Sequence, residues 1–372
     1  MTRFVCHDCG LDFDVMVPRW RCECGGLLDL GFTPALDPAK VARRPATLWR
    51  YREALPVPEG AELTLGEGVT PMVEVELGGR GVLVKQEQLF PTGSYKDRGA
   101  AIMMAMAAHI GVTDVVEDSS GNAGCAVSAF AAKAGIHCRI FVPADNSPGK
   151  LGQIELYGAE LTPVPGTRED TAKACMAAAQ DHYYASHVYN PFFFHGTKTF
   201  AYEVVEQLGW KGPDTVVLPA GNGTLLLGAH IGFTELRDMG LIERVPRLVA
   251  VQSARCAPLC AAFASGADAV TATASAPTLA EGIAIALPMR GQQMLEAVRN
   301  TGGTCLAVSE EAILAAFRDA GSKGFCIEPT SAAVVAGAAQ YAQSADSGET
   351  IVTMFTGHGL KVGDKLHKLV SD

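Results

Sequence analysis

Short runs of apolar, mostly β-branched residues alternate with longer Ala-rich segments along most of the chain. Such runs indicate buried strands, and the Ala-rich segments between them indicate helices. The predicted strands cover residues 82–85, 114–116, 138–142, 215–218, 248–251 and 351–355, and the predicted helices include residues 123–134 and 169–179. The succession of strand, helix and strand predicts an α/β protein built around mostly parallel sheets.

Length and charge narrow the classes of protein that fit this pattern. The 372 residues predict two domains and a small appendage, at roughly 150 residues per domain. A formal charge of −10 and 48% hydrophobic residues exclude a disordered chain, and they make nucleic acid an unexpected partner. The longest apolar stretch, residues 100–108, is too short to span a bilayer, so no membrane partner is expected. The first residues lack the apolar core of an export signal, which predicts a cytoplasmic protein with reduced thiols.

Two closely spaced cysteine pairs stand near the N-terminus. Cys6 and Cys9 are followed, after twelve residues, by Cys22 and Cys24, and each pair precedes a glycine. This spacing is typical of two turns that direct four thiolates at one structural zinc ion. Ordinary thiols that hold no metal are the other interpretation.

A lysine lies where turn residues give way to an apolar helix. Lys96 follows the turn residues 91–94 and precedes the predicted helical residues 99–108. The positive end of a helix dipole disfavours a cation and suits a Schiff-base amine. Taken alone, a surface lysine is the simpler interpretation.

Three further turns follow predicted strands, where ligands of α/β proteins bind. Ser119, Ser120, Gly121 and Asn122 open a helix and offer amides and neutral donors to a carboxylate or a phenolic oxygen, or else merely cap the helix.

The second turn contains Gly221 and Gly223, which allow close approach of a phosphate to the backbone, and Thr224 adds a hydroxyl. The third glycine comes too late for a dinucleotide motif, which favours a single phosphate over a pyrophosphate. Taken alone, an ordinary strand-to-helix turn is the other interpretation. In the third turn, Thr356 places a hydroxyl at the end of the last predicted strand. An amine, an Asn turn, a monophosphate loop and a terminal hydroxyl together suit pyridoxal 5′-phosphate.

At these residues the sequence resembles the fold-type II pyridoxal-phosphate enzymes, and within them it is similar to threonine synthases. The likeness runs from the cysteine pairs to the last turn, through residues 66–71, 91–99, 196–203, 328–331 and 356–361.

The resemblance implies two open, twisted, mostly parallel sheet domains with an N-terminal zinc-ribbon-like appendage. The expected bounds are 1–55 for the appendage, 56–95 with 200–372 for a large cofactor domain, and 96–199 for a smaller mobile domain. A homodimer is implied by the resemblance alone.

The resemblance also implies the role of each site residue. Lys96 binds the cofactor covalently and acts as the catalytic base, Asn122 contacts its phenolic oxygen, and Thr356 faces the pyridine nitrogen. Its phosphate is held by Gly221, Asn222, Gly223, Thr224 and Leu225. The substrate carboxylate is expected on the turn of Ser119, Ser120 and Gly121.

One segment departs from the threonine synthase pattern. These enzymes usually have an Asn-Ser pair before Asn190-Pro191 and an Arg just after, which together hold the substrate phosphate. Here His187, Val188 and Phe193 occupy that neighbourhood, so a phosphate would lose its cationic partner. We expect His187 and Phe193 to contact a substrate that is not selected for phosphate, although the aromatic residues 192–194 also suit a core.

Three functions fit these observations. The first is a lyase that eliminates or replaces a group at Cβ or Cγ of an amino acid without strong phosphate selectivity, for example a serine or threonine dehydratase. The second is an authentic threonine synthase, which converts O-phosphohomoserine and water to threonine and phosphate. The third is a silent binding protein, which the complete set of cofactor residues disfavours.

Overall fold

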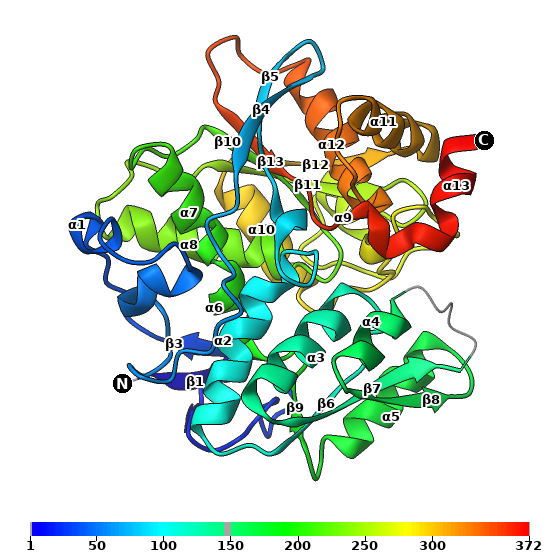
Figure 1. Cartoon of the computed structure of the whole chain (residues 1–372). Helices are drawn as coiled ribbons and strands as arrows, with labels where there is room; N and C mark the ends of the chain where they lie inside the picture. Colours follow the sequence, from blue (N-terminus) through cyan, green and yellow to red (C-terminus); the bar gives the residue numbers. More distant parts are fainter. Residues whose placement is uncertain (1, 145–149, 372) are drawn as a thin grey trace. The chain divides into compact units, whose positions relative to one another are not determined.

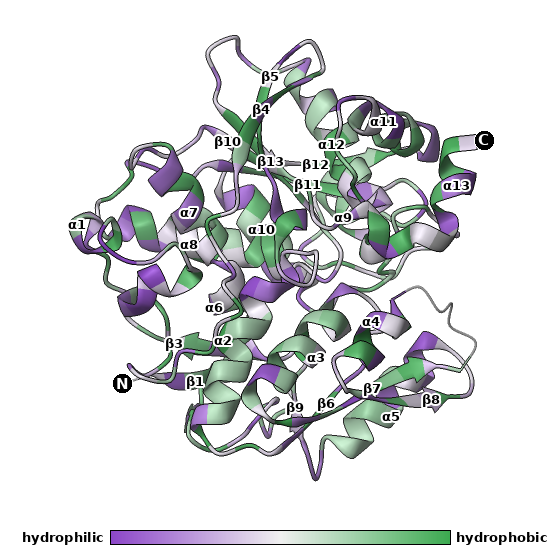
Figure 2. Ribbon diagram, viewed as in Figure 1, coloured by the Kyte–Doolittle hydropathy of each residue, from purple (hydrophilic) through white to green (hydrophobic). Residues whose placement is uncertain are grey.

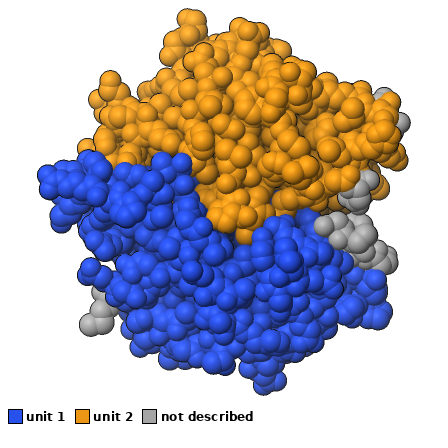
Figure 3. Space-filling model, viewed as in Figure 1, with its two compact units in different colours: residues 1–69, 96–197 blue, residues 70–95, 198–372 orange. Residues whose placement is uncertain are grey.

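A computed structural model of the chain describes residues 2–144 and 150–371. The chain forms two structural units, and each unit is made of two separate segments of the sequence. Unit 1 contains residues 1–69 and 96–197, and unit 2 contains residues 70–95 and 198–372 (Figure 3). No helix among the described residues is long and apolar enough to cross a membrane.

Unit 1 is built on a four-stranded parallel sheet in the order β8-β7-β6-β9. Its elements after residue 95 are α2 (Lys96–His109), β6 (Asp114–Glu117), α3 (Asn122–Ala134), β7 (His137–Pro143), α4 (Leu151–Leu156), β8 (Glu160–Val164), α5 (Arg168–Ala178), β9 (Tyr183–Tyr184) and α6 (Pro191–Thr197). Side chains alternate between the two faces of the sheet. Val115 packs in one core with α2 and α3, whereas Val116 packs with Cys175 of α5. Helices therefore cover both faces of this sheet (Figure 1).

The N-terminal segment of unit 1 forms a small antiparallel sheet in the order β2-β1-β3. Its elements are β1 (Arg3–Cys6), β2 (Asp12–Asp14), β3 (Leu28–Gly31), α1 (Pro38–Val41) and the 3₁₀ helix η1 (Leu48–Ala54). Phe4, Leu28 and Leu48 are buried in the same hydrophobic core as α2. Residues 1–69 thus group with unit 1, where the sequence suggested an appendage of residues 1–55.

Unit 2 is built on a six-stranded sheet in the order β12-β11-β10-β13-β5-β4, in which only the β4–β5 pair is antiparallel. Its strands are β4 (Met72–Leu77), β5 (Arg80–Lys85), β10 (Thr215–Pro219), β11 (Arg247–Ser253), β12 (Thr304–Val308) and β13 (Ile351–Met354). Its helices are η2 (Glu87–Leu89), α7 (Thr199–Gln207), α8 (Thr224–Asp238), α9 (Pro258–Ser265), η3 (Glu281–Ile283), α10 (Gly291–Asn300), α11 (Glu310–Ser322), α12 (Pro329–Ala342), η4 (Gly359–Val362) and α13 (Gly363–Ser371). Val217 and Val251 pack in one core with α12. Most residues of α12 are buried, and most of them are hydrophobic, as the colours of Figure 2 show.

Every strand and helix predicted from the sequence is confirmed, with ends that differ by only a few residues. In the two larger sheets the sequence pattern did not reveal β4, β8, β9 and β12, and each has a physical reason for its weak signal; the three short strands of the N-terminal sheet were not predicted either. Strands β4, β8 and β12 lie at sheet edges and alternate with polar or half-exposed residues, and β9 has only two residues.

Candidate active site

Both parallel sheets reverse their strand order at the places where the sequence predicted a ligand. In unit 2 the chain runs from β10 through β11 to β12 on one side, and β13 then pairs with the other side of β10. In unit 1 it runs from β6 through β7 to β8, and β9 pairs with the other side of β6. Ligands of open α/β sheets bind at such switch points, beyond the carboxyl ends of the strands.

At the switch point of unit 2, a glycine loop joins β10 to α8. Gly223 has a φ of +80°, and a Cβ atom there would lie 2.5 Å from the sulfur of Met294. Gly223 is the N-cap of α8 and has no side chain to bond the first amides of the helix. A helix start of this kind offers its amides to an anion, which suits a phosphate monoester.

Thr356 follows the neighbouring strand β13 and is held by two buried side chains. Its hydroxyl oxygen lies 2.9 Å from Ser331 Oγ and donates to Glu328 Oε1 at 2.9 Å. Ser331 Oγ also accepts from the Thr356 amide at 2.7 Å. These bonds fix the position of the Thr356 hydroxyl at the carboxyl edge of the sheet.

Ser94 and Tyr95, the last residues of their segment of unit 2, lie at the same edge. The Tyr95 amide donates to the Thr356 carbonyl at 3.1 Å, and the Tyr95 hydroxyl lies 2.9 Å from Thr224 Oγ1. Ser94 Oγ is buried, and no described residue accepts from it or donates to it. A buried polar atom normally has a partner, so Ser94 indicates a place for a bound polar group.

At the switch point of unit 1, the turn after β6 leads directly into α3. Asn122 is the first residue of α3, and its N-cap Gly121 places no side chain on the first amides of the helix. The Gly121 amide donates to Ser119 Oγ at 3.2 Å. At Gly124 a Cβ atom would lie 1.9 Å from the Ser119 carbonyl oxygen, so only glycine allows the turn to lie this close to the helix. The start of α3, which no side chain caps, suits a carboxylate.

Lys96 is the first residue of α2, and its position depends on contacts between α2 and α6. Its ammonium nitrogen lies 5.6 Å from the centroid of the Phe193 ring. A Cβ atom at Gly99 would lie 2.4 Å from that ring, and one at Gly196 would lie 2.1 Å from the Arg98 carbonyl oxygen. The two helices therefore touch through glycines directly beside Lys96.

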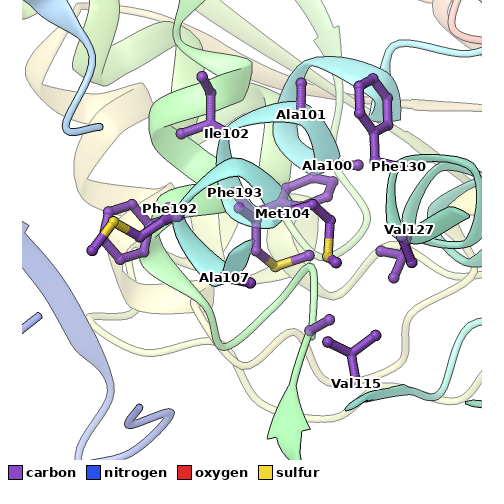
Figure 4. Close-up of a cluster of buried hydrophobic side chains, with 14 of the residues drawn as sticks. Ala100, Ala101, Ile102, Met104, Ala107, Val115, Val127, Phe130, Phe192 and Phe193 are labelled. Carbon is purple, nitrogen blue, oxygen red and sulfur yellow. The ribbon is translucent and has the colours of Figure 1, made fainter. Parts of the chain in front are cut away.

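The aromatic residues of α6 are buried within unit 1. Phe192 packs edge-on against Phe4 at 5.8 Å between ring centroids, and Phe193 is fully buried beside α2. Figure 4 shows Phe192 and Phe193 among the apolar side chains of α2, such as Met104. Phe192 and Phe193 are thus part of the core of unit 1, and Phe193 also lies next to Lys96.

His187 follows β9 and pairs with the last residue of β6. Its Nδ1 lies 2.7 Å from Glu117 Oε1, and both side chains are buried, with 7% of His187 and none of Glu117 exposed. The second oxygen of Glu117 accepts from the Ser119 amide. The His187–Glu117 pair is therefore attached to the turn that offers its amides to a carboxylate.

The four N-terminal cysteines converge on one point of unit 1. Their sulfur atoms all lie within 4.8 Å of one another, with 3.5 Å between Cys6 and Cys24 and 3.6 Å between Cys9 and Cys22. Zn–S bonds of about 2.3 Å in a tetrahedron place sulfur atoms roughly 3.8 Å apart, so the cluster fits a zinc ion.

The predicted site residues fall into two groups. Lys96, the turn of residues 119–122, His187 and Phe193 belong to unit 1, and residues 221–225 and Thr356 belong to unit 2. Sequence reasoning did not assign a role to Glu117, Glu328 or Ser331. Of these, Ser331 and Glu328 lie in a segment on which the resemblance rests, whereas the only sign of Glu117 was its place at a strand end.

Comparison with known proteins identifies the family. Residues 63–357 match the family described as "Pyridoxal-phosphate dependent enzyme". The chain is 33% identical to the threonine synthase of Methanosarcina acetivorans, over 97% of this chain and 92% of the relative. It is 34% identical to that of Methanocaldococcus jannaschii, over 96% and 93%.

Among solved structures, the chain is similar to processed threonine deaminase isoform 2 from Solanum lycopersicum, with a TM-score of 0.70, 21% identity and 96% coverage of each chain. It is also similar to maize serine racemase, with a TM-score of 0.69 and 19% identity over 81% of this chain and 92% of that one. These likenesses support the fold that the sequence predicted. The chain therefore belongs to the pyridoxal-phosphate dependent enzymes of fold type II, as a threonine synthase-like lyase.

Proposed function

We propose that this lyase eliminates or replaces a group at Cβ or Cγ of an amino acid and does not require a phosphorylated substrate. Pyridoxal phosphate, when bound, withdraws electrons from Cα of the substrate and so makes its proton removable. Lys96 holds the cofactor and then accepts the Cα proton as general base. The turn of Ser119, Ser120 and Gly121, at the start of α3 that no side chain caps, binds the substrate carboxylate.

The remaining cofactor contacts are assigned by the same proposal. Asn122 bonds the phenolic oxygen. The loop of Gly221, Asn222 and Gly223 and the first residues of α8, Thr224 and Leu225, bind the phosphate. Thr356 faces the pyridine nitrogen. The uncapped start of α8 and the buried, unpartnered hydroxyl of Ser94 support a polar ligand in unit 2.

The absence of phosphate selectivity rests mainly on the pairing of His187 with Glu117. In the threonine synthase pattern this neighbourhood binds a phosphate dianion, but here a buried carboxylate lies 2.7 Å from the histidine. Any positive charge on His187 is already balanced by Glu117, and Phe193 supplies no charge. A dianion placed there would be desolvated without a cationic partner, which is costly.

Lys198, which is close to this segment in sequence, does not offer a spare cation. Its amine lies 2.8 Å from Glu235 Oε1 within unit 2. Burial of Lys198 lowers its pKa, and the Glu235 carboxylate opposes that effect. The amine is therefore already used by a buried ion pair.

Competition kinetics test this proposal. The purified holoenzyme is given O-phosphohomoserine together with serine, threonine or a bulkier β-hydroxy amino acid, and release of phosphate and of 2-oxo acid is measured. We expect the larger kcat/KM for an unphosphorylated substrate. A clearly larger kcat/KM for O-phosphohomoserine would contradict the proposal.

Authentic threonine synthase activity is the second candidate, because the identity to threonine synthases extends over nearly the whole chain. It predicts threonine and phosphate as products of O-phosphohomoserine. The same competition experiment separates the two candidates.

A further inference from the structure

We propose that His187 is the proton donor to a hydroxyl leaving group, with Glu117 as the residue that positions it. The inference rests on the proposed function, and it assigns the substrate class as β-hydroxy amino acids. It is carried by four features of unit 1: the pairing of the two side chains, their place in the sheet, their link to the turn proposed to bind the carboxylate, and the Phe193 ring that lies near both His187 and Lys96.

The pairing leaves one nitrogen of the ring for chemistry. Glu117 engages Nδ1 at 2.7 Å, and among the described residues no hydrogen bond reaches Nε2. A buried carboxylate on one nitrogen fixes the orientation of the ring. His187 can therefore present Nε2–H as an acid.

The sheet places this acid at a ligand-binding edge. Glu117 ends β6, and His187 follows β9, the strand that pairs with β6 on the far side from β7. These two strands define the switch point of unit 1. A second set of pairs, His137 and His182 with Asp114, lies at the opposite end of β6, where such sheets do not bind ligands.

Two contacts tie the pair to the reacting groups. Glu117 also accepts from the amide of Ser119, in the turn proposed to hold the substrate carboxylate. The His187 ring lies 6.0 Å from the Phe193 ring, and the Lys96 amine lies 5.6 Å from the same ring. The base and the acid thus both lie near one aromatic side chain of α6.

The proton transfers balance as follows. Lys96 takes the proton from Cα, and the electron pair of that C–H bond forms the double bond between Cα and Cβ. The Cβ–O bond breaks with its electron pair on oxygen, which takes the proton from His187 Nε2 and leaves as water. His187 becomes neutral and is reprotonated from solvent, and hydrolysis of the enamine gives a 2-oxo acid and ammonia.

Leaving-group dependence tests the role of His187. Serine and 3-chloroalanine share a carbon skeleton and both yield pyruvate, but chloride departs without a proton. In the holoenzyme we expect His187→Gln to lower kcat for serine or threonine by about 10²- to 10⁴-fold, and to change kcat for 3-chloroalanine by only a few-fold. Glu117→Gln should produce a smaller loss with the same selectivity.

His182→Gln is the matched control, because its ring also bonds a carboxylate of β6, at 2.7 Å. It should leave both activities unchanged. The double variant Glu117→Gln/His187→Gln keeps the buried pair neutral, and it provides the same comparison if His187→Gln fails to fold.

A readout that needs no cofactor comes from the imidazole N–H resonances of ¹⁵N-histidine protein. One slowly exchanging signal should vanish in His187→Gln and shift in Glu117→Gln. Three results would overturn the role of His187. In His187→Gln, kcat falls equally for serine and 3-chloroalanine, or it falls for neither. The third is a parent enzyme that eliminates only chloride. A parent that eliminates neither group and instead prefers O-phosphohomoserine would contradict the proposed function as well.

Discussion

The hydroxyl oxygen of Tyr95 lies 2.9 Å from Thr224 Oγ1, at the first residue of α8. The amide of Tyr95 adds a bond to the carbonyl of Thr356. Tyr95 thus links two segments of unit 2 to which the proposal gives a cofactor role, and it directly precedes Lys96 in the chain.

Tyr95→Phe should weaken retention of the cofactor while leaving the fold intact. Loss of one net hydrogen bond is worth about 1 kcal/mol, which corresponds to about a fivefold larger dissociation constant for pyridoxal phosphate. Equilibrium dialysis measures this dissociation constant in the parent and in Tyr95→Phe. Tyr341→Phe is the matched control, since the Tyr341 hydroxyl bonds Glu349 at 2.8 Å and Thr215 at the start of β10. Equal effects of the two substitutions would contradict this role of Tyr95.

Lys96→Ala should remove the visible absorption that a covalently bound cofactor gives to the parent protein. The substitution deletes the amine at the start of α2 that the proposal assigns to the covalent bond. Lys133→Ala, which removes an exposed lysine from α3, should keep the colour. If borohydride fixed the cofactor onto another lysine of a coloured Lys96→Ala protein, the assignment would be wrong.

Local signals made much of the site predictable, and long-range pairing made the rest unpredictable. Lys96 and Asn122 begin helices, and Gly221 and Gly223 lie in the loop between a strand and a helix, so their place could be read from neighbouring residues. Glu117 and His187 are 70 residues apart and meet only because β9 pairs with β6. With two residues, β9 leaves almost no pattern in the sequence.

The same distinction explains the fold. Buried central strands such as β10 are continuous apolar runs, which the sequence shows plainly. The grouping of residues 1–69 with α2 depends instead on contacts of Phe4 and Leu28 with a core formed mainly by later residues. No local pattern encodes such contacts.

Gly196→Ala should destabilise unit 1 by about 1–3 kcal/mol, because the new methyl group would meet the Arg98 carbonyl oxygen at 2.1 Å. Separation of α6 from α2 should also displace Lys96 and reduce cofactor retention. Denaturant unfolding and dialysis measure the two effects. Gly152→Ala in α4 is the control, since nothing lies within 4 Å of its Cβ position, and it should be neutral or slightly stabilising. A Gly196→Ala protein as stable as this control would contradict the close contact.

Cys22→Ser should abolish binding of one zinc ion and loosen the N-terminal sheet without removing the lyase chemistry. Four thiolates leave no open position on the metal, which excludes a direct role in catalysis. Metal analysis of gently purified protein gives the stoichiometry, and proteolysis of the first 60 residues or so reports the loosening. Cys326→Ser, which changes an exposed cysteine outside the cluster, should retain the metal. Stoichiometric zinc in Cys22→Ser would place the metal elsewhere.

The ion pair between Arg44 and Glu53 should make the stability of unit 1 depend on pH in the acid range. Arg44 Nη1 donates to Glu53 Oε2 at 2.5 Å, and this bond lowers the pKa of Glu53 from 4.5 to about 2. A depressed pKa in the folded state stabilises the fold above the unfolded pKa of 4.5, and the contribution is lost as the pH falls toward 2. The Glu53 side chain is 38% exposed, so screening by water limits the effect to about 1 kcal/mol or less.

The test is to measure the free energy of unfolding between pH 5 and pH 3. It should change less with pH in Glu53→Gln than in the parent. Glu296→Gln removes an exposed carboxylate that accepts a hydrogen bond from the Gln292 amide and should follow the parent. An identical pH dependence for both variants would contradict the assignment.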